Sequence, residues 1–145
     1  MQPYPHRYAV NATGAAAGHV VVACEGVCDM ETAPPAEFDG PGDRWSPETL
    51  LCAAVADCTI LSFRAIARAS RFEWLQIQCR TEGTLDRVDG KARFVGFASH
   101  VQLTVPAGAD AARARQLVEK AEHGCLISNS LIAERTLSVD VQFRS

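Results

Sequence analysis

One segment constrains the fold more than any other part of the sequence: the helix start Ser46-Pro47-Glu48, which leads into a long apolar run. Serine is a favoured N-cap, proline is tolerated at the first helical position, and an acid in the first turn faces the positive end of the helix dipole. We expect the helix to continue to about Ser70. Because its apolar residues cover a wide arc, we predict that it is buried on most sides and central to the fold.

The most apolar part of this helix, residues 50–63, spans 14 residues and includes Asp57. A bilayer span needs about 20 predominantly apolar residues, so this stretch is short for a membrane helix. The N-terminal sequence MQPYPHRYAV lacks the basic region and apolar core of a secretory signal. We therefore predict a cytoplasmic protein in which this helix is internal.

Strand patterns precede the helix. Residues 6–27 contain two β-prone runs, at 8–10 and 19–23, joined by a glycine-rich turn, and we expect a hairpin there. Residues 33–43 are rich in proline, glycine and aspartate, which predicts an irregular loop. Loops of this kind often carry functional side chains.

Strand and helix patterns alternate after the helix. Residues 74–79 and 94–105 have the alternation of strands on either side of an Asp89-Gly90 turn, so we expect an antiparallel pair. The remaining elements that we expect are a helix at 110–123 closed by Gly124, a short helix at 126–134 and a last strand at 136–143. Strands on both sides of a long helix predict an α+β fold.

The chain has 145 residues, about the size of one ordinary domain, and we predict a single domain over residues 1–145. Its hydrophobic fraction of 48% and charged fraction of 21% are those of a globular protein. The net charge of -3 and the scattered lysines and arginines provide no basic stripe for phosphates or lipid headgroups. We expect neither nucleic acid nor a membrane as a partner.

Six cysteines, at positions 24, 28, 52, 58, 79 and 125, offer structural or reactive thiols. Without a secretory signal, cysteines are more often buried hydrophobes, catalytic thiols or metal ligands than structural disulfides. A zinc site built from Cys24, Cys28 and either His123 or Cys125 is disfavoured, because the spacing lacks two knuckle-like pairs and Cys24 lies in a predicted strand whose alternate residues face the core. We predict no metal site, and we expect core positions for Cys52 and Cys79.

Two motifs give the sequence its functional character. Ser46-Pro47-Glu48-Thr49-Leu50-Leu51 is followed by Ala56-Asp57-Cys58, and Glu122-His123-Gly124-Cys125 is followed by Leu126-Ile127-Ser128-Asn129-Ser130-Leu131. At this separation the pair resembles the two cysteine motifs of the OsmC/Ohr family (osmotically inducible protein C and organic hydroperoxide resistance proteins). The resemblance implies a curved antiparallel sheet wrapped around a long central helix, in an intertwined homodimer.

The resemblance also implies a thiol peroxidase that reduces organic hydroperoxides or hydrogen peroxide. In that chemistry Cys58 attacks the peroxide and becomes a sulfenic acid, and Cys125 resolves it to a disulfide. No cofactor is needed, because sulfur stores the two electrons. A dithiol, of the lipoyl type by analogy with the family, then reduces the disulfide.

Two further site residues follow from the resemblance. Family members lower the pKa of the attacking thiol with an arginine held by the glutamate at the helix start, and Glu48 matches that glutamate. The residues Glu37-Phe38 stand where the family arginine is expected, so we assign its role to Arg44, four residues before Glu48. Ten residues of helix separate Glu48 from Cys58 by about 15 Å, so a shared site requires Glu48, and with it Arg44, from a second subunit.

Alternatives remain for each site residue. Glu48 also suits a first-turn acid that only stabilises the helix, and Arg44 also suits a solvated loop residue. Cys58 alone has the character of a buried structural cysteine. His123, two residues before Cys125, is more typical of a surface residue, although it is placed to tune that thiol. A non-enzymatic OsmC-like protein that binds a hydrophobic small molecule in the dimer cleft, or senses oxidants through the same cysteines, is the rival to the enzyme.

Overall fold

The computed structural model describes residues 1–145 and has an α+β fold of six strands, two α-helices and two short 3-10 helices. The chain divides into two compact units, Met1–Leu50 and Leu51–Ser145. Each unit has its own sheet, so the arrangement within one chain is two three-stranded sheets.

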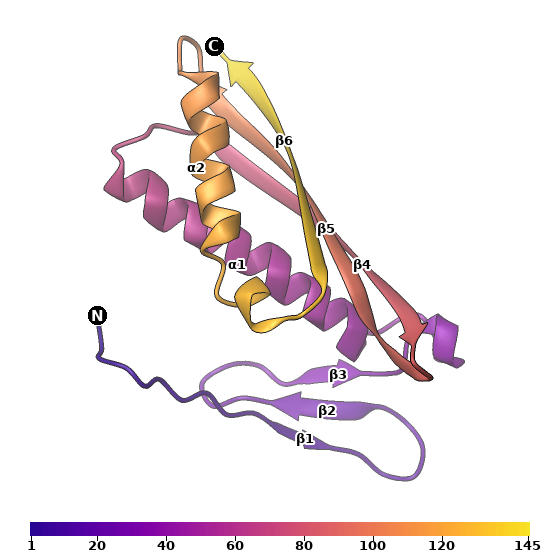
Figure 1. Ribbon diagram of the computed structural model, residues 1–145. Helices are drawn as coiled ribbons and strands as arrows, with labels where there is room; N and C mark the ends of the chain where they lie inside the picture. The colour runs from indigo at the N-terminus through magenta and orange to yellow at the C-terminus, as the bar shows by residue number, and fades with distance from the viewer. The chain divides into compact units, whose positions relative to one another are not determined.

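The first unit contains a small antiparallel sheet in the order β1-β2-β3, formed by β1 (Asn11–Thr13), β2 (Val20–Ala23) and β3 (Met30–Thr32) (Figure 1). The predicted hairpin is confirmed, although its first strand lies at residues 11–13, after the run at 8–10. Strand β3, which the sequence did not reveal, makes a second hairpin with β2. The predicted loop follows and contains the 3-10 helix η1 (Ala36–Phe38).

Helix α1 (Pro47–Ala69) begins and ends close to the predicted residues. Ser46 caps it: the Ser46 hydroxyl oxygen accepts from the Thr49 N–H at 3.1 Å, and the Ser46 N–H donates to the Thr49 hydroxyl at 3.0 Å. This reciprocal pair satisfies the first free N–H groups of the helix, in the manner of a capping box.

The burial of α1 differs from the expectation. Its fully buried residues, Val55, Thr59, Phe63 and Ala67, recur every four positions and form one narrow stripe. By length and composition, this helix of 23 residues could cross a bilayer, which corrects the shorter apolar span read from the sequence. Of its most apolar 18 residues, 22% are buried within the chain. The core helix of a globular protein meets the same criterion, and the buried stripe of α1 is part of a core. Burial on most sides is therefore not achieved within one chain.

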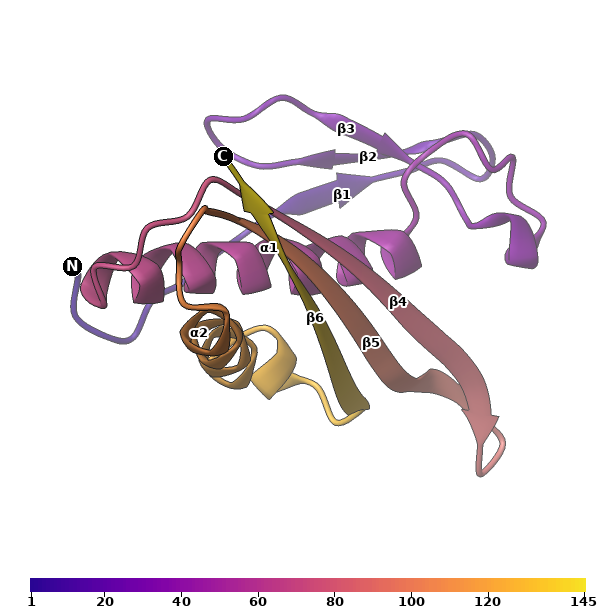
Figure 2. The ribbon, with the colours of Figure 1, turned by 90° about the horizontal axis from the view of Figure 1, so that it is seen from above.

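The second unit is built on the sheet β4-β5-β6, formed by β4 (Gln76–Val88), β5 (Lys91–Pro106) and β6 (Glu134–Arg144). Strands β4 and β5 are antiparallel, as predicted, and Asp89 and Gly90 both have positive φ in the turn between them. Strand β6 runs parallel to β5, so the prediction of an antiparallel sheet is wrong for this strand (Figure 2). The reason is the crossover through the helix that separates β5 from β6, which returns the chain to the same end of the sheet.

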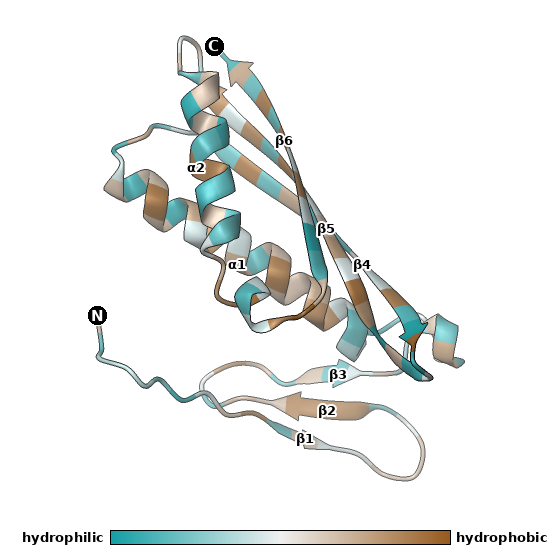
Figure 3. Ribbon diagram, in the orientation of Figure 1, coloured by the Kyte–Doolittle hydropathy of each residue, from teal (hydrophilic) through white to brown (hydrophobic).

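That crossover helix, α2 (Ala111–His123), begins at the N-cap Asp110 and ends at Gly124, as predicted. The core of the unit joins Phe63 of α1, Val101 and Leu103 of β5, and Leu117 and Val118 of α2. Apolar and polar residues alternate along the strands, so one face of the sheet is turned to this core (Figure 3).

The segment after α2 corrects a second prediction. In place of a helix at residues 126–134, the chain makes only the 3-10 helix η2 (Ser128–Ser130) and becomes extended at Leu131. The short connection follows because β6 already begins at Glu134.

Candidate redox site

Cys58 and Cys125 meet in the second unit. Cys58 lies in the middle of α1 and Cys125 directly follows the Gly124 cap of α2. The two thiols lie close enough for each to shift the pKa of the other. The Cys58 sulfur also lies 3.9 Å from the Ser62 hydroxyl, one helical turn further along α1. Two cysteines far apart in the sequence thus share one small site.

The backbone around Cys125 is fixed on both sides. The Cys125 N–H donates to the Glu122 carbonyl at 3.1 Å, and the Asn129 N–H donates to the Cys125 carbonyl at 2.9 Å. Arg135 of β6 contacts the side chains of Glu122 and Asn129. Its guanidinium lies 3.1 Å from the Glu122 carboxylate and donates to the Asn129 side-chain oxygen at 2.8 Å. The Cys125 side chain itself is 0% exposed.

Hydrogen bonds make Cys125 the more acidic thiol of the pair. Burial is the largest single effect on Cys125 and acts to raise its pKa. The Ser128 side chain and N–H, the Cys58 thiol and the Ile127 N–H together outweigh burial, so the pKa of Cys125 lies below its ordinary value. Ser128, which sequence reasoning missed, lies in the polar run after Cys125, and that run was its only signal.

Cys58 is shifted in the opposite direction. Burial raises the pKa of its thiol, and the neighbouring Cys125 raises it further. The Ile127 N–H and the Ser62 hydroxyl lower it, but not enough to compensate. The opposite shifts make Cys125 the thiol of the pair that loses its proton more readily.

Two more thiols lie in this unit, and both pack against the core as expected. Burial raises the pKa of Cys79, and the charge of the nearby Cys125 raises it as well. Burial also raises the pKa of Cys52, whose sulfur would lie 2.8 Å from a Cβ placed on Gly83. Such desolvated thiols are typical of unreactive structural cysteines.

Glu48 and Arg44 belong to the first unit, and there they do not pair with each other. The Arg44 guanidinium lies 3.2 Å from the Glu31 carboxylate and 3.2 Å from the Asp43 carboxylate. One carboxylate oxygen of Glu48 is buried without a hydrogen-bond partner. The carboxylate that the resemblance matches to an arginine partner is thus unpaired within this chain.

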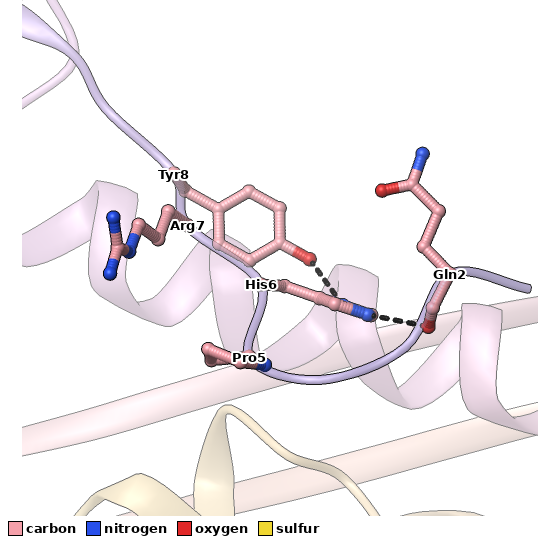
Figure 4. Close-up of a pocket in the computed structure, with 5 residues that line it drawn as sticks. All are labelled: Gln2, Pro5, His6, Arg7 and Tyr8. Carbon is pink, nitrogen blue, oxygen red and sulfur yellow. Dashed lines mark hydrogen bonds between the residues drawn. The ribbon is translucent and has the colours of Figure 1, made fainter.

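An apolar pocket of about 490 Å³ lies beside this carboxylate in the first unit. Val20 and Val22 of β2, Pro34 and Phe38 of the loop, and Glu48 contribute to its wall. A second pocket, near the N-terminus, is lined by Gln2, Pro5, His6, Arg7 and Tyr8 (Figure 4). All five of these residues are exposed, and none resembles a thiol-site residue.

The other residues considered as ligands are dispersed. No three His, Cys, Asp or Glu side chains gather as a possible metal site. Cys24 and Cys28 are both exposed, so the expectation that Cys24 lies in a strand turned to the core is wrong. His123 is exposed and is not among the groups that set the pKa of Cys125.

Comparison with known proteins identifies the family. The model of the OsmC-like protein family matches residues 40–141. The peroxiredoxin OsmC of Escherichia coli is 32% identical over 100 residues, which cover 69% of this chain and 68% of that protein. The uncharacterized protein YmaD of Bacillus subtilis is 27% identical over 113 residues, which cover 76% of this chain and 75% of that protein. The chain belongs to the OsmC-like family.

Solved structures agree with this fold. An organic hydroperoxide resistance protein OsmC from Legionella pneumophila has a TM-score of 0.76 at 25% identity, over 97% of this chain and 99% of that one. An OsmC-like protein of unknown function from Vibrio cholerae has a TM-score of 0.85 at 16% identity, over 93% of this chain and 99% of that one. The resemblance seen in the cysteine motifs is confirmed.

Proposed function

We propose that the chain is a thiol-dependent peroxide reductase that acts on organic hydroperoxides through a Cys58–Cys125 sulfenate and disulfide cycle. The observation that carries the proposal is the meeting of these two thiols beside the Ser128 and Ile127 N–H groups. Relatives named as a peroxiredoxin and as an organic hydroperoxide resistance protein support a peroxide-related redox function.

Access assigns the roles within the pair. Cys125 is 0% exposed, whereas Cys58 is only partly buried, so a peroxide reaches the Cys58 sulfur first. The Cys58 thiolate attacks the outer peroxide oxygen, the O–O bond breaks, and the alkoxide takes a proton and leaves as an alcohol. The lowered pKa of Cys125 suits the next step, in which its thiolate attacks the Cys58 sulfenic acid and hydroxide leaves as water. An external dithiol of the lipoyl type reduces the disulfide by exchange.

The first step requires the negative charge to move to Cys58. Burial and Cys125 both raise the pKa of Cys58, so a cation must be supplied from outside the pair. We assign this role to Arg44, with Glu48 as its support, and both come from a second subunit because ten residues of helix separate Glu48 from Cys58. In that assembly Arg44 exchanges its contacts with Glu31 and Asp43 for the reacting site.

The assembly that we propose is the intertwined homodimer of the family. Only one stripe of α1 is fully buried within the chain, and Leu61 on the same helix is 49% exposed. A second copy that covers α1 would bury this surface and give the helix its expected environment. The reducing interior of the cell, where free thiols persist, is the compartment that we propose.

The pocket in the first unit supports an organic substrate. Its wall is largely apolar and suits an alkyl or aryl group, and the buried, unpaired Glu48 oxygen is an acceptor for the hydroperoxyl hydrogen. Hydrogen peroxide would gain the hydrogen bond without the apolar contacts. We therefore expect a preference for hydroperoxides with an apolar group.

The deciding experiment is peroxide consumption with dihydrolipoamide as reductant, with cumene hydroperoxide and hydrogen peroxide compared. Cys58→Ser should lower the rate by on the order of a thousandfold or more, because the nucleophile is lost. The matched control is Cys52→Ser, the same substitution on the same helix, which should retain most of the activity. Equal losses in the two variants would contradict the assignment of Cys58.

A second candidate function rests on the same pocket: binding of an apolar molecule without chemistry, or oxidant sensing. Sensing predicts that wild-type protein is oxidised once by hydroperoxide without turnover with any dithiol, whereas binding alone predicts no consumption. Steady consumption over many equivalents of peroxide would exclude both, and a single equivalent would favour sensing.

A further inference from the structure

Cys24 and Cys28 lie on either side of the turn that joins β2 to β3 in the first unit. The register pairs Val20 with Thr32, Val21 with Glu31 and Val22 with Met30. If this register is continued past its last pair, Ala23 is opposed to Asp29 and then Cys24 to Cys28. Residues directly opposed in an antiparallel pair have Cβ atoms about 4.5–5.5 Å apart.

The turn between the two cysteines is well formed. The Val27 N–H donates to the Cys24 carbonyl at 3.2 Å, which closes the turn. Gly26 has a φ of +83°, a conformation that glycine adopts without strain. Glu25, Gly26 and Val27 thus lie between the two cysteines, with the spacing of a three-residue hairpin connection.

Both thiols are exposed and free. The one polar contact of either is a weak hydrogen bond from the Cys24 thiol to the Ala9 carbonyl, at 3.7 Å. A disulfide needs Cα atoms about 4.4–6.8 Å apart and Cβ atoms about 3.5–4.5 Å apart, a spacing that opposed hairpin residues reach with a small adjustment. A disulfide also requires the exposed Cys24 side chain to rotate away from Ala9.

We propose that Cys24 and Cys28 form a second, solvent-facing dithiol site that exchanges with small disulfides. One cysteine thiolate attacks a disulfide R–S–S–R, the S–S bond breaks, and one R–S⁻ leaves and takes a proton. The other cysteine then attacks the mixed disulfide, the second R–SH leaves, and the Cys24–Cys28 disulfide remains. The protein pair is oxidised by two electrons and the small disulfide is reduced to two thiols.

The charges of the hairpin select the class of disulfide. Glu25 lies in the loop, Asp29 follows Cys28, and Glu31 lies two residues further along β3. The basic groups near Glu31 are Arg44, whose charge Asp43 shares, and His19, at 3.7 Å. The end of the hairpin is therefore acidic, so it repels anionic disulfides and favours neutral or cationic ones.

The test uses the full chain with Cys58→Ser and Cys125→Ser, so that its outcome is independent of the proposed peroxidase cycle. Cystamine, a cationic disulfide, and glutathione disulfide, an anionic one, are the probes. With cystamine, we expect the peptide containing Cys24 and Cys28 to lose two hydrogens and to carry no adduct. At low salt, cystamine should react at least about fivefold faster than glutathione disulfide, and the ratio should fall in concentrated salt, where only the difference between the leaving thiols remains.

Cys28→Ser in the same background is the control, because it should stop at a stable mixed disulfide on Cys24. Persistent mixed disulfides on both cysteines of the unsubstituted hairpin would overturn the proposal, since they would show that the ring does not close. Glutathione disulfide reacting as fast as cystamine at low salt would overturn the charge selection.

Discussion

The two cysteine pairs of this chain are assembled by different kinds of structure. Cys58 and Cys125 come from a helix and from the end of a crossover connection, and they meet only when the second unit folds. Cys24 and Cys28 flank one hairpin turn and are exposed. The first pair depends on long-range packing, whereas the second depends on one turn.

This difference controls how each pair reacts. Enclosure surrounds Cys125 with N–H and hydroxyl donors, which stabilise its thiolate but prevent contact with reagents in solution. The hairpin pair has no such shell, so access and the acidic charges nearby govern it. A simple reactive cysteine is both acidic and accessible. In the Cys58–Cys125 pair, Cys125 is the more acidic thiol and Cys58 the more accessible one.

The largest expected contrast is in alkylation of the native protein. Cys24 and Cys28 should react with iodoacetamide on the order of 100-fold faster than Cys125, because a fully buried sulfur reacts only after local opening. Peptide mass spectrometry over time gives each rate, and denatured protein provides the reference for intrinsic reactivity. Comparable native rates at Cys125 and Cys24 would remove the distinction between the two pairs.

A second contrast lies in the pH dependence of Cys58. Cys125 raises the pKa of Cys58 by charge and by hydrogen bonding, so Cys125→Ser should lower it and make Cys58 reactive at a lower pH. The measurement is the rate of Cys58 alkylation as a function of pH. Cys79→Ser is the matched control, because Cys79 interacts with Cys125 but is not among the groups that shift Cys58. A Cys58 profile that moves to higher pH in Cys125→Ser would reverse the assigned coupling.

The two regions also contain glycines whose substitution should lower the free energy of unfolding for different reasons. A Cβ on Gly83 would lie 2.8 Å from the Cys52 sulfur and 2.8 Å from a ring carbon of Phe94, so Gly83→Ala should destabilise the protein by about 1–3 kcal/mol through overpacking. Gly26 has open space around its Cβ position and a φ of +83°, so Gly26→Ala should cost about 1–2 kcal/mol through backbone strain alone.

Asparagine distinguishes these two mechanisms in urea unfolding. It tolerates positive φ, so Gly26→Asn should cost less than Gly26→Ala, whereas Gly83→Asn should cost more than Gly83→Ala because the side chain is larger. If Ala and Asn ranked in the same order of stability cost at Gly26 and at Gly83, the two positions would not be limited by different effects.

Sequence patterns predicted the local elements well, because each rests on interactions between near neighbours. The Ser46 cap, the Asp89-Gly90 turn and the Asp110 to Gly124 helix are such features, and all three were confirmed. The parallel direction of β6 was missed, because alternation along a strand does not encode the direction of its partner. The short strand β3 has only three residues, too few for a period to be visible.

For the site too, local motifs were visible in the sequence and contacts between distant segments were not. Matching motifs predicted Cys58 and Cys125 as the reactive pair, and the structure brings them together. The donors around them became visible only in the structure, since Ser128 and Ile127 act through a 3-10 turn that was predicted as a helix. The proposed pairing of Cys24 with Cys28 also needed the register of β3. An exposed hairpin pair has no hydrophobic pattern that would reveal it.

The smallest expected change in stability, and the sharpest test of the composite site, is at Arg44. Its ion pairs are partly exposed, with side chains 34% exposed for Arg44 and 57% for Glu31, so Arg44→Ala should cost less than about 1 kcal/mol of unfolding free energy. If Arg44 supplies the cation for Cys58, the same variant should slow Cys58 oxidation at neutral pH and move its reactivity to higher pH. Arg44→Lys should recover only part of the rate, because a point charge lacks the planar fork.

Glu31→Gln separates this role from a merely structural one. It removes a carboxylate that competes for Arg44, so a catalytic Arg44 predicts an equal or faster rate of Cys58 oxidation in Glu31→Gln. A structural Arg44 that only orders the loop through Glu31 predicts that both variants slow the reaction, because either one breaks the same contact. The measurement is the peroxide-reaction rate across a pH series for wild type, Arg44→Ala, Arg44→Lys and Glu31→Gln. Unchanged profiles in Arg44→Ala would exclude Arg44, and the cation that moves charge from Cys125 to Cys58 would then have to be another basic residue of the dimer.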